Sequence, residues 1–243
     1  MKSKKLKIIG IAVMTVVIVC LIAGFIYFDT HYAVINKKVY RNDIKTIEGT
    51  NLTKKEDTDY HISLEINSVR EVNKCTELEE MRLSSVPENS FSEFINFPNL
   101  KKLMILSSDI SGTDCEKISQ FDKLEELIFC ETDVDFTGFN SDTVSSISFI
   151  SGTFKNFEVL AECKSLKVMN IGPYHTNIME DISVFADFDY IEELWLSVYK
   201  IEDISSFLEM DSLKTLEVNK ESVSEADVKL LEEKGVTVTY YNS

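Results

Sequence analysis

The chain has 243 residues, of which 44% are hydrophobic and 27% are charged, with 8 glycines and 3 prolines. This is the composition of a folded protein, and it excludes a disordered or collagen-like chain. Acidic residues number 41 and basic residues 25, and the first seven residues hold four of the lysines and no acid, so the remainder carries a net charge of -20. A field of that sign excludes nucleic acid and anionic lipid surfaces as favourable partners.

An uncharged run of 21 residues extends from Ile8 to Phe28. As a helix it would span roughly 31 Å at ~1.5 Å per residue, which matches the hydrocarbon core of a bilayer. The run is longer than the apolar region of a cleaved signal peptide, and no A-x-A site follows it. We therefore predict an uncleaved transmembrane anchor over 8–28 that contacts the lipid bilayer.

The orientation of this anchor follows from the charges beside it. The segment 1–7 is predicted to be a cytoplasmic tail, because positively charged flanks stay inside, although Lys37, Lys38 and Arg41 on the other flank weaken the asymmetry. The rest of the chain is then extracytoplasmic. Residues 29–58 are polar and aperiodic, and they are interpreted as a stalk or linker.

From residue 59 onward the sequence repeats. The pattern L-x-x-L-x-L, with Ile, Val, Met and Phe allowed, recurs at steps of 22, 24, 20, 22, 25 and 22 residues. Its windows begin at Leu78, Leu100, Leu124, Val144, Leu166, Ile191 and Leu213. Alternation within each window predicts a strand, and the near-constant step predicts stacked repeats that share one core.

A second set of apolar residues precedes most windows at intervals of three. Such spacing favours a short α or 3₁₀ helix with one buried face. Its members are Val69, Val72, Cys75; Phe91, Phe94, Phe97; Ile118, Phe121; Phe154, Phe157, Leu160, Cys163; Ile182, Phe185, Phe188; and Ile204, Phe207, Met210. The predicted fold class is α/β: a solenoid over 59–243, with parallel strands on the concave face and helical returns on the convex face.

A family resemblance is carried by two segments, IEDISSFLEMDSLKTLEV from Ile201 and MEDISVFADFDYIEELWL from Met179. The chain resembles leucine-rich repeat proteins of the short, roughly 22-residue class, bacterial internalin-like and SDS22-like, over about 62–241. This resemblance implies a protein-interaction module that binds through its concave face. The family's usual Asn after each strand is replaced here, so we expect irregular turns at Ser108, Thr132, Gly152, Tyr174, Tyr199 and Glu221.

Both ends of the repeat array carry segments that could cover the core. The sequence HISLEI, residues 61–66, predicts a first edge strand. Near the other end, Ser224 is a predicted helix N-cap and Gly235 a predicted helix stop. The alternating VTVTYY that follows predicts a final strand.

The sequence offers no set of catalytic residues. The histidines His31, His61 and His175 are far apart in the repeat frame, and the scattered glycines form no phosphate loop. We therefore predict no enzymatic activity and no cofactor. The paired glutamates at 79–80, 125–126 and 192–193 are interpreted as parts of charge ladders between strands, for example Glu80, Lys102 and Glu126.

The four cysteines after the uncharged run are predicted to be free thiols. No C-x-x-C pair suggests a zinc ribbon, and Cys75 and Cys163 fall at the same phase four repeats apart, too far to join. We interpret those of the repeats, Cys75, Cys115, Cys130 and Cys163, as small apolar side chains on buried faces.

The outward strand positions predict the binding surface. Period two sends positions three, five and seven of each window to solvent. Three adjacent strands place Met104, Leu106, Ile128, Cys130 and Ile150 there, and apolar groups at solvent-facing positions mark a contact surface. With Trp195 and the polar rim of Glu80, Lys102 and Glu126, these residues form the predicted site for a partner protein. The alternative is a glycan or peptide-ligand site in which Trp195, Tyr174 and Tyr199 provide stacking groups.

Overall fold

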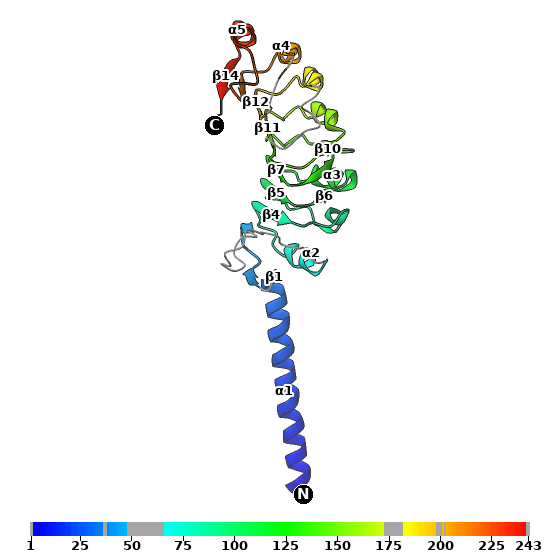
Figure 1. Ribbon diagram of the computed structural model, residues 1–243. Coiled ribbons are helices and arrows are strands. Elements are labelled where there is room, and N and C mark those ends of the chain that lie inside the picture. Colours follow the sequence, from blue (N-terminus) through cyan, green and yellow to red (C-terminus); the bar gives the residue numbers. More distant parts are fainter. Residues whose placement is uncertain are drawn as a thin grey trace.

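The computed structural model describes residues 2–35, 38–47, 66–172, 182–197, 201 and 203–241. A long helix, α1 (Lys2–His31), projects from one end of a curved stack of repeats (Figure 1). In the described residues the main sheet has nine strands, in the order β14-β13-β12-β11-β9-β7-β5-β4-β3. These are β3 (Thr46–Ile47), β4 (Glu80–Ser84), β5 (Lys102–Leu106), β7 (Glu126–Cys130), β9 (Ser146–Phe149), β11 (Val168–Ile171), β12 (Glu193–Leu196), β13 (Thr215–Val218) and β14 (Thr237–Tyr240).

Every pairing within this sheet is parallel, and the register follows the predicted windows. Position four of each window lies beside position four of the next, so Leu103 pairs with Met81 on one side and Leu127 on the other. The residues at positions one, four and six of all seven windows are buried. The predicted phase and the predicted solenoid of stacked repeats with parallel strands are therefore confirmed.

Short helices return the chain along the other side of the stack. They are α2 (Ile66–Val72), η1 (Ser90–Glu93), α3 (Gly112–Ile118), η2 (Phe157–Glu162), η3 (Ser183–Asp187) and α4 (Ser205–Glu209). Their inward residues carry the predicted period of three, and phenylalanine rings meet between repeats. The ring centroids of Phe97 and Phe121 are 6.1 Å apart, and those of Phe157 and Phe188 are 5.3 Å apart. These aromatic contacts fill the space between sheet and returns.

A second, three-stranded parallel sheet follows the turns of the middle repeats. It consists of β6 (Asp109–Ile110), β8 (Asp133–Asp135) and β10 (Phe154–Lys155), with β8 in the centre. The sequence does not predict this sheet, because strands of two or three residues carry no measurable alternation. These strands form a sheet separate from the nine-stranded one.

The turns after β4, β5 and β7 share one feature, a non-glycine residue with a positive φ: Ser85, Ser107 and Glu131. Ser108 Oγ accepts a hydrogen bond from Val86 N and donates one to Leu106 O. Thr132 Oγ1 donates to Cys130 O at 2.9 Å. These buried hydroxyls satisfy part of the turn backbone, while the residue before each of them, Ser107 and Glu131, adopts a left-handed conformation with a φ of 46° and 50°.

The first strand of the sheet is not the one predicted. Its edge is β3, which pairs with Glu80 and Met81 of β4, and the ion pair of Lys45 with Glu79 lies beside it. Ile66, predicted to end an edge strand, begins α2 instead, because its apolar neighbours Val69 and Val72 follow helical spacing. The rest of that predicted strand, 61–65, lies outside the described residues.

The C-terminal cover is as predicted. Ser224 Oγ accepts a hydrogen bond from Asp227 N at the start of α5 (Glu225–Lys234). Gly235 ends the helix with a φ of 98°, a left-handed conformation that glycine adopts without strain. The strand β14 then pairs with β13 and closes the sheet.

The segment interpreted as a stalk contains regular structure. Strands β1 (Tyr32–Ile35) and β2 (Lys38–Arg41) pair antiparallel directly after α1. Asn42 ties this hairpin to the helix end, since its N donates to His31 O and its Nδ2 to Thr30 O. Free carbonyls at a helix C-terminus need such donors.

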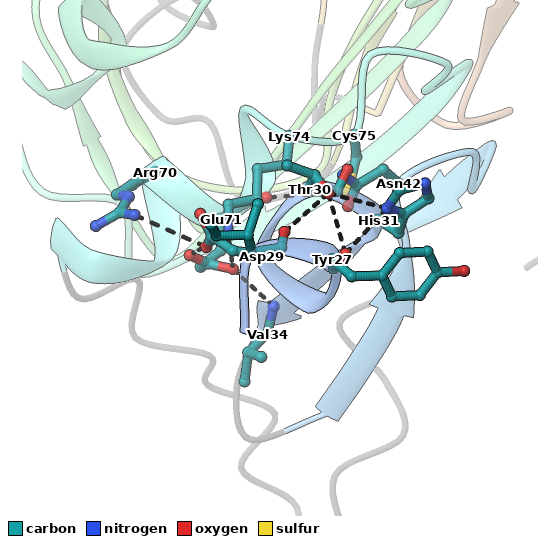
Figure 2. A network of polar contacts seen from close by, with 11 residues as sticks. Tyr27, Asp29, Thr30, His31, Val34, Asn42, Arg70, Glu71, Lys74 and Cys75 are labelled. Carbon is teal, nitrogen blue, oxygen red and sulfur yellow. Dashed lines mark hydrogen bonds and ion pairs between the residues drawn. The ribbon is translucent and has the colours of Figure 1, made fainter. Parts of the chain in front are cut away.

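A polar network connects α1 to the first repeat (Figure 2). Lys74 is largely buried, and its Nζ lies 2.6 Å from Asp29 Oδ1 and 3.0 Å from Glu71 Oε1. Glu71 in turn accepts a hydrogen bond from Val34 N of the hairpin. Burial alone would lower the pKa of Lys74, but its hydrogen bonds with the two carboxylates raise it. Lys74 therefore holds the helix end, the hairpin and α2 together.

Within the described part of the chain, no helix combines the length and the hydropathy needed to cross a membrane. The anchor over 8–28 therefore stays a prediction from the sequence.

We predict that Leu127→Asp destabilises the solenoid. Leu127 is fully buried at the centre of the sheet, so an aspartate there would be a buried charge without a partner. The free energy of unfolding should fall by about 3 kcal/mol or more. Chemical denaturation would measure it, with Asn140→Asp on an exposed loop as the control; equal stability of the two variants would contradict the register.

We predict that Lys74→Met raises the pKa of Asp29. The hydrogen bond and charge of Lys74 hold that pKa below its ordinary value, and Arg70, 3.9 Å away, contributes less. Because the pKa of Asp29 is lower in the folded protein than in the unfolded chain, its ionised form stabilises the fold at pH values above the unfolded pKa. This stabilisation is lost as the pH falls through the folded pKa. The pKa of Asp29, measured by NMR titration, should rise more in Lys74→Met than in Arg70→Met. Equal rises would show that Lys74 does not lower this pKa more than Arg70 does.

Candidate functional site: the concave face

The outward residues of the main sheet form rows that run from strand to strand. Registered neighbours in parallel strands are ~4.8 Å apart, so each row is a continuous line of adjacent side chains. The fifth-position row reads Arg82, Met104, Ile128, Ser148, Asn170, Trp195, Glu217 and Thr239. Side chains that are far apart in the sequence therefore lie on one surface.

The predicted apolar patch lies on this surface, but its members differ in exposure. Ile150 is 44% exposed, whereas Met104, Leu106 and Cys130 are half-buried. Ile128 is only 7% exposed, because it stands in register between Met104 and Ser148 in the middle of the sheet. The patch is thus present in the structure, but Ile128 is buried within it and is not one of its solvent-exposed members.

The predicted charge ladder is formed in part, and a second ladder runs beside it. Lys102 Nζ lies 2.8 Å from Glu126 Oε2, as expected for the third positions. At the second positions, Glu79 pairs with Lys45 and Lys101. A further set joins Glu192 to Lys167 and Lys214.

These ion pairs lower the pKa values of two of the glutamates. The hydrogen bond and charge of Lys45 lower the pKa of Glu79. The hydrogen bond from Lys214 does the same to Glu192. Both carboxylates are therefore more firmly ionised than usual, which suits ladder members and not general acids.

The C-terminal half of the concave face has a different composition. Trp195, 37% exposed, lies directly beside Glu217 of the next strand, and Glu193 stands two residues before it on the same face. Tyr241 is half-buried at the edge of this group. Burial, together with the nearby charge of Glu217, raises the pKa of Tyr241. The sequence pattern predicts a role for Trp195 but not for its carboxylate neighbours, although Glu217 shares the fifth window position with Trp195 and Glu193 stands at the third.

The turns beside the middle repeats line a shallow acidic groove. Its residues include Glu88, Asp109, Glu131, Asp133 and Asp135, with Lys155 as a basic member. Two of these carboxylates bind the protein itself: Asp133 accepts hydrogen bonds from Thr153, and Asp135 from Thr137 and Asn156. Nowhere in the described residues do three or more His, Cys, Asp or Glu side chains form a group that could hold a metal ion.

Three of the cysteines that were predicted to be buried free thiols are buried and free. Burial raises the pKa of Cys75 to about 11, and it also raises the pKa of Cys115 and Cys163. His31 is engaged with the end of α1 through Tyr27 O and Thr30 Oγ1. His61, His175, Tyr174 and Tyr199 lie outside the described residues, so the predicted stacking role of the two tyrosines stays a prediction.

No protein-family model and no curated protein matches the sequence. Among solved structures, internalin C2 of Listeria monocytogenes is similar at 14% identity and a TM-score of 0.48, over 70% of this chain and 74% of that one. An internalin, inlF, of the same organism is similar at 15% identity and a TM-score of 0.43, over 72% of this chain and 66% of that one. A plant peptide hormone receptor, RGFR1 in complex with RGF2, is similar at 12% identity and a TM-score of 0.37, over 71% of this chain and 30% of that one. These are similarities of fold, and the repeat architecture described above rests on the register and burial of this chain.

We predict that two isoleucines of the concave patch differ in their effect on stability. Ile128→Ser removes a buried side chain and should lower the free energy of unfolding by about 1–3 kcal/mol. Ile150→Ser removes an exposed one and should stay within about 0.5 kcal/mol of the parent. Thermal or chemical denaturation of both variants measures the difference; a larger loss in Ile150→Ser would reverse the assignment of which residue faces solvent.

Proposed function

We propose that the chain is a membrane-anchored, extracytoplasmic interaction module that binds another protein through its concave face. The observation that carries the proposal is the apolar group around Ile150, Met104 and Leu106 at outward strand positions. Solvent-facing positions of a sheet are normally polar, and a contiguous apolar group there is costly unless a partner covers it. Interface anchors are commonly aliphatic or aromatic and ringed by polar groups such as Lys102 and Glu126.

The membrane anchor is supported by the sequence and by exposure along α1. The uncharged run 8–28 has the length of a bilayer span. From Val17 to Phe28, consecutive large apolar side chains are exposed, among them Leu21 at 68% and Phe25 at 72%. Exposed apolar residues on every side of a helix are favourable in lipid and unfavourable in water.

The outward orientation rests on the lysines of the segment 1–7. With α1 in the membrane, the Lys74 network would hold the first repeat close to the bilayer and direct the stack of repeats away from it. A binding face at the surface of the cell follows from this arrangement.

A glycan or peptide-ligand binder is the second candidate. The exposed ring of Trp195 favours it, because sugar rings and peptide groups stack on indoles. Such a ligand would occupy the C-terminal half of the face and leave the apolar patch uncovered. The two candidates therefore differ in which variants lose binding.

The test is cross-linked capture from native membranes with matched variants. Met104→Ser combined with Ile150→Ser should weaken capture of the partner by about 1 kcal/mol or more per anchor. Ile95→Ser is the control, because Ile95 is 36% exposed but follows η1 on the return side of the repeats. Normal capture by the concave double variant, or equal loss with Ile95→Ser, would remove the apolar patch as the binding surface.

A further inference from the structure

Two glutamates on the concave face lack the basic neighbours that the ladder glutamates have. Glu193 stands in register between Val168 and Thr215. Glu217 stands between Trp195 and Thr239. In contrast, Glu126 has Lys102 beside it, and Glu79 and Glu192 each pair with two lysines. Among the described residues, no ion pair neutralises Glu193 or Glu217.

These two carboxylates flank an exposed indole. Glu217 is the registered neighbour of Trp195, at a strand spacing of ~4.8 Å, and Glu193 is two residues away along the same strand and on the same face. Trp195 is the one tryptophan in the sequence, and it is 37% exposed. The electron-rich face of an indole attracts cations, and two nearby carboxylates add Coulomb attraction and hydrogen-bond acceptors.

We infer that Trp195, Glu193 and Glu217 form a binding site for a lysine or arginine side chain of the partner protein. This inference rests on the proposed function, since it names the chemistry that the concave face recognises. A partner segment with a basic residue over Trp195 would supply the positive charge that Glu193 and Glu217 lack within this chain. The net charge of -20 after residue 7 would also speed the encounter with a basic partner.

Other ligand chemistries fit the site less well. An anion would be repelled by both carboxylates, and a neutral sugar could stack on Trp195 and donate hydrogen bonds to the carboxylates but would leave both of their charges uncompensated. A divalent metal needs several oxygen ligands that converge within about 2.6 Å, whereas Glu193 and Glu217 are only two carboxylates, diagonal to each other on neighbouring strands, and the described residues hold no group of three or more that could bind a metal ion. A side chain with a long apolar stem and a terminal cation can cover the ring and reach a carboxylate at once.

Fluorescence of the full-length chain tests the site directly, because the emission of its tryptophan reports on Trp195 alone. The probe is tetralysine amide, and the neutral comparison is the same peptide with acetylated side chains. Tetralysine should give a saturable change in emission that weakens as salt is added, and the acetylated peptide should give none. Choline chloride distinguishes a lipid headgroup cation from a protein side chain.

Three variants with the same change of charge make the test specific. Glu193→Gln and Glu217→Gln should each weaken tetralysine binding by about threefold or more. Glu209→Gln, at an exposed position in α4 on the return side, should bind like the parent. Equal weakening by all three variants, no response to tetralysine, or a stronger response to choline would overturn the inference.

The same variants separate this inference from the proposed function. Loss of capture in the Met104 and Ile150 double variant, with no response to tetralysine, rejects the cation site and leaves the concave interface in place. A specific tetralysine response together with normal capture by that double variant supports the cation site and rejects the apolar patch.

Discussion

The structure depends on the burial of the first, fourth and sixth residues of each window in one unbroken parallel register. A single repeat could not bury these side chains, because its strand and its short return enclose too little volume. Stacking gives Leu103 the neighbours Met81 and Leu127, and the phenylalanines of the returns meet in the same way between repeats. Each added repeat therefore stabilises the one before it.

The functional surface is a consequence of this register. Once the inward positions are fixed, alternation sends the intervening residues to the concave face, where the chain can vary them without loss of the core. The face then divides into an apolar region around Ile150 and an acidic, aromatic region around Trp195. The polar joint at Lys74 connects this surface to α1, so the orientation of the face and of the helix are set together.

The repeats could be predicted from the sequence because their signal recurs seven times, and the cap at Ser224 because its residues satisfy a helix end locally. Residues whose state depends on neighbouring strands were less predictable. Ile128 has an outward direction but is buried by flanking side chains, which alternation alone does not reveal. The edge strand β3 was missed because two residues carry no period. The open carboxylates at Glu193 and Glu217 emerge only when the windows are compared column by column.

The central claim is that one register places the outward positions of successive strands side by side on the concave face. Disulfide formation between introduced cysteines measures this most directly, in a Cys130→Ser background. Ser148→Cys with Asn170→Cys joins registered neighbours, whose Cα atoms should be ~4.8 Å apart and within disulfide range. Ser148→Cys with Val168→Cys is displaced by two residues along the strand, beyond that range. The shared register predicts rapid oxidation of the first pair and little of the second; oxidation of the second pair in preference to the first would contradict this register.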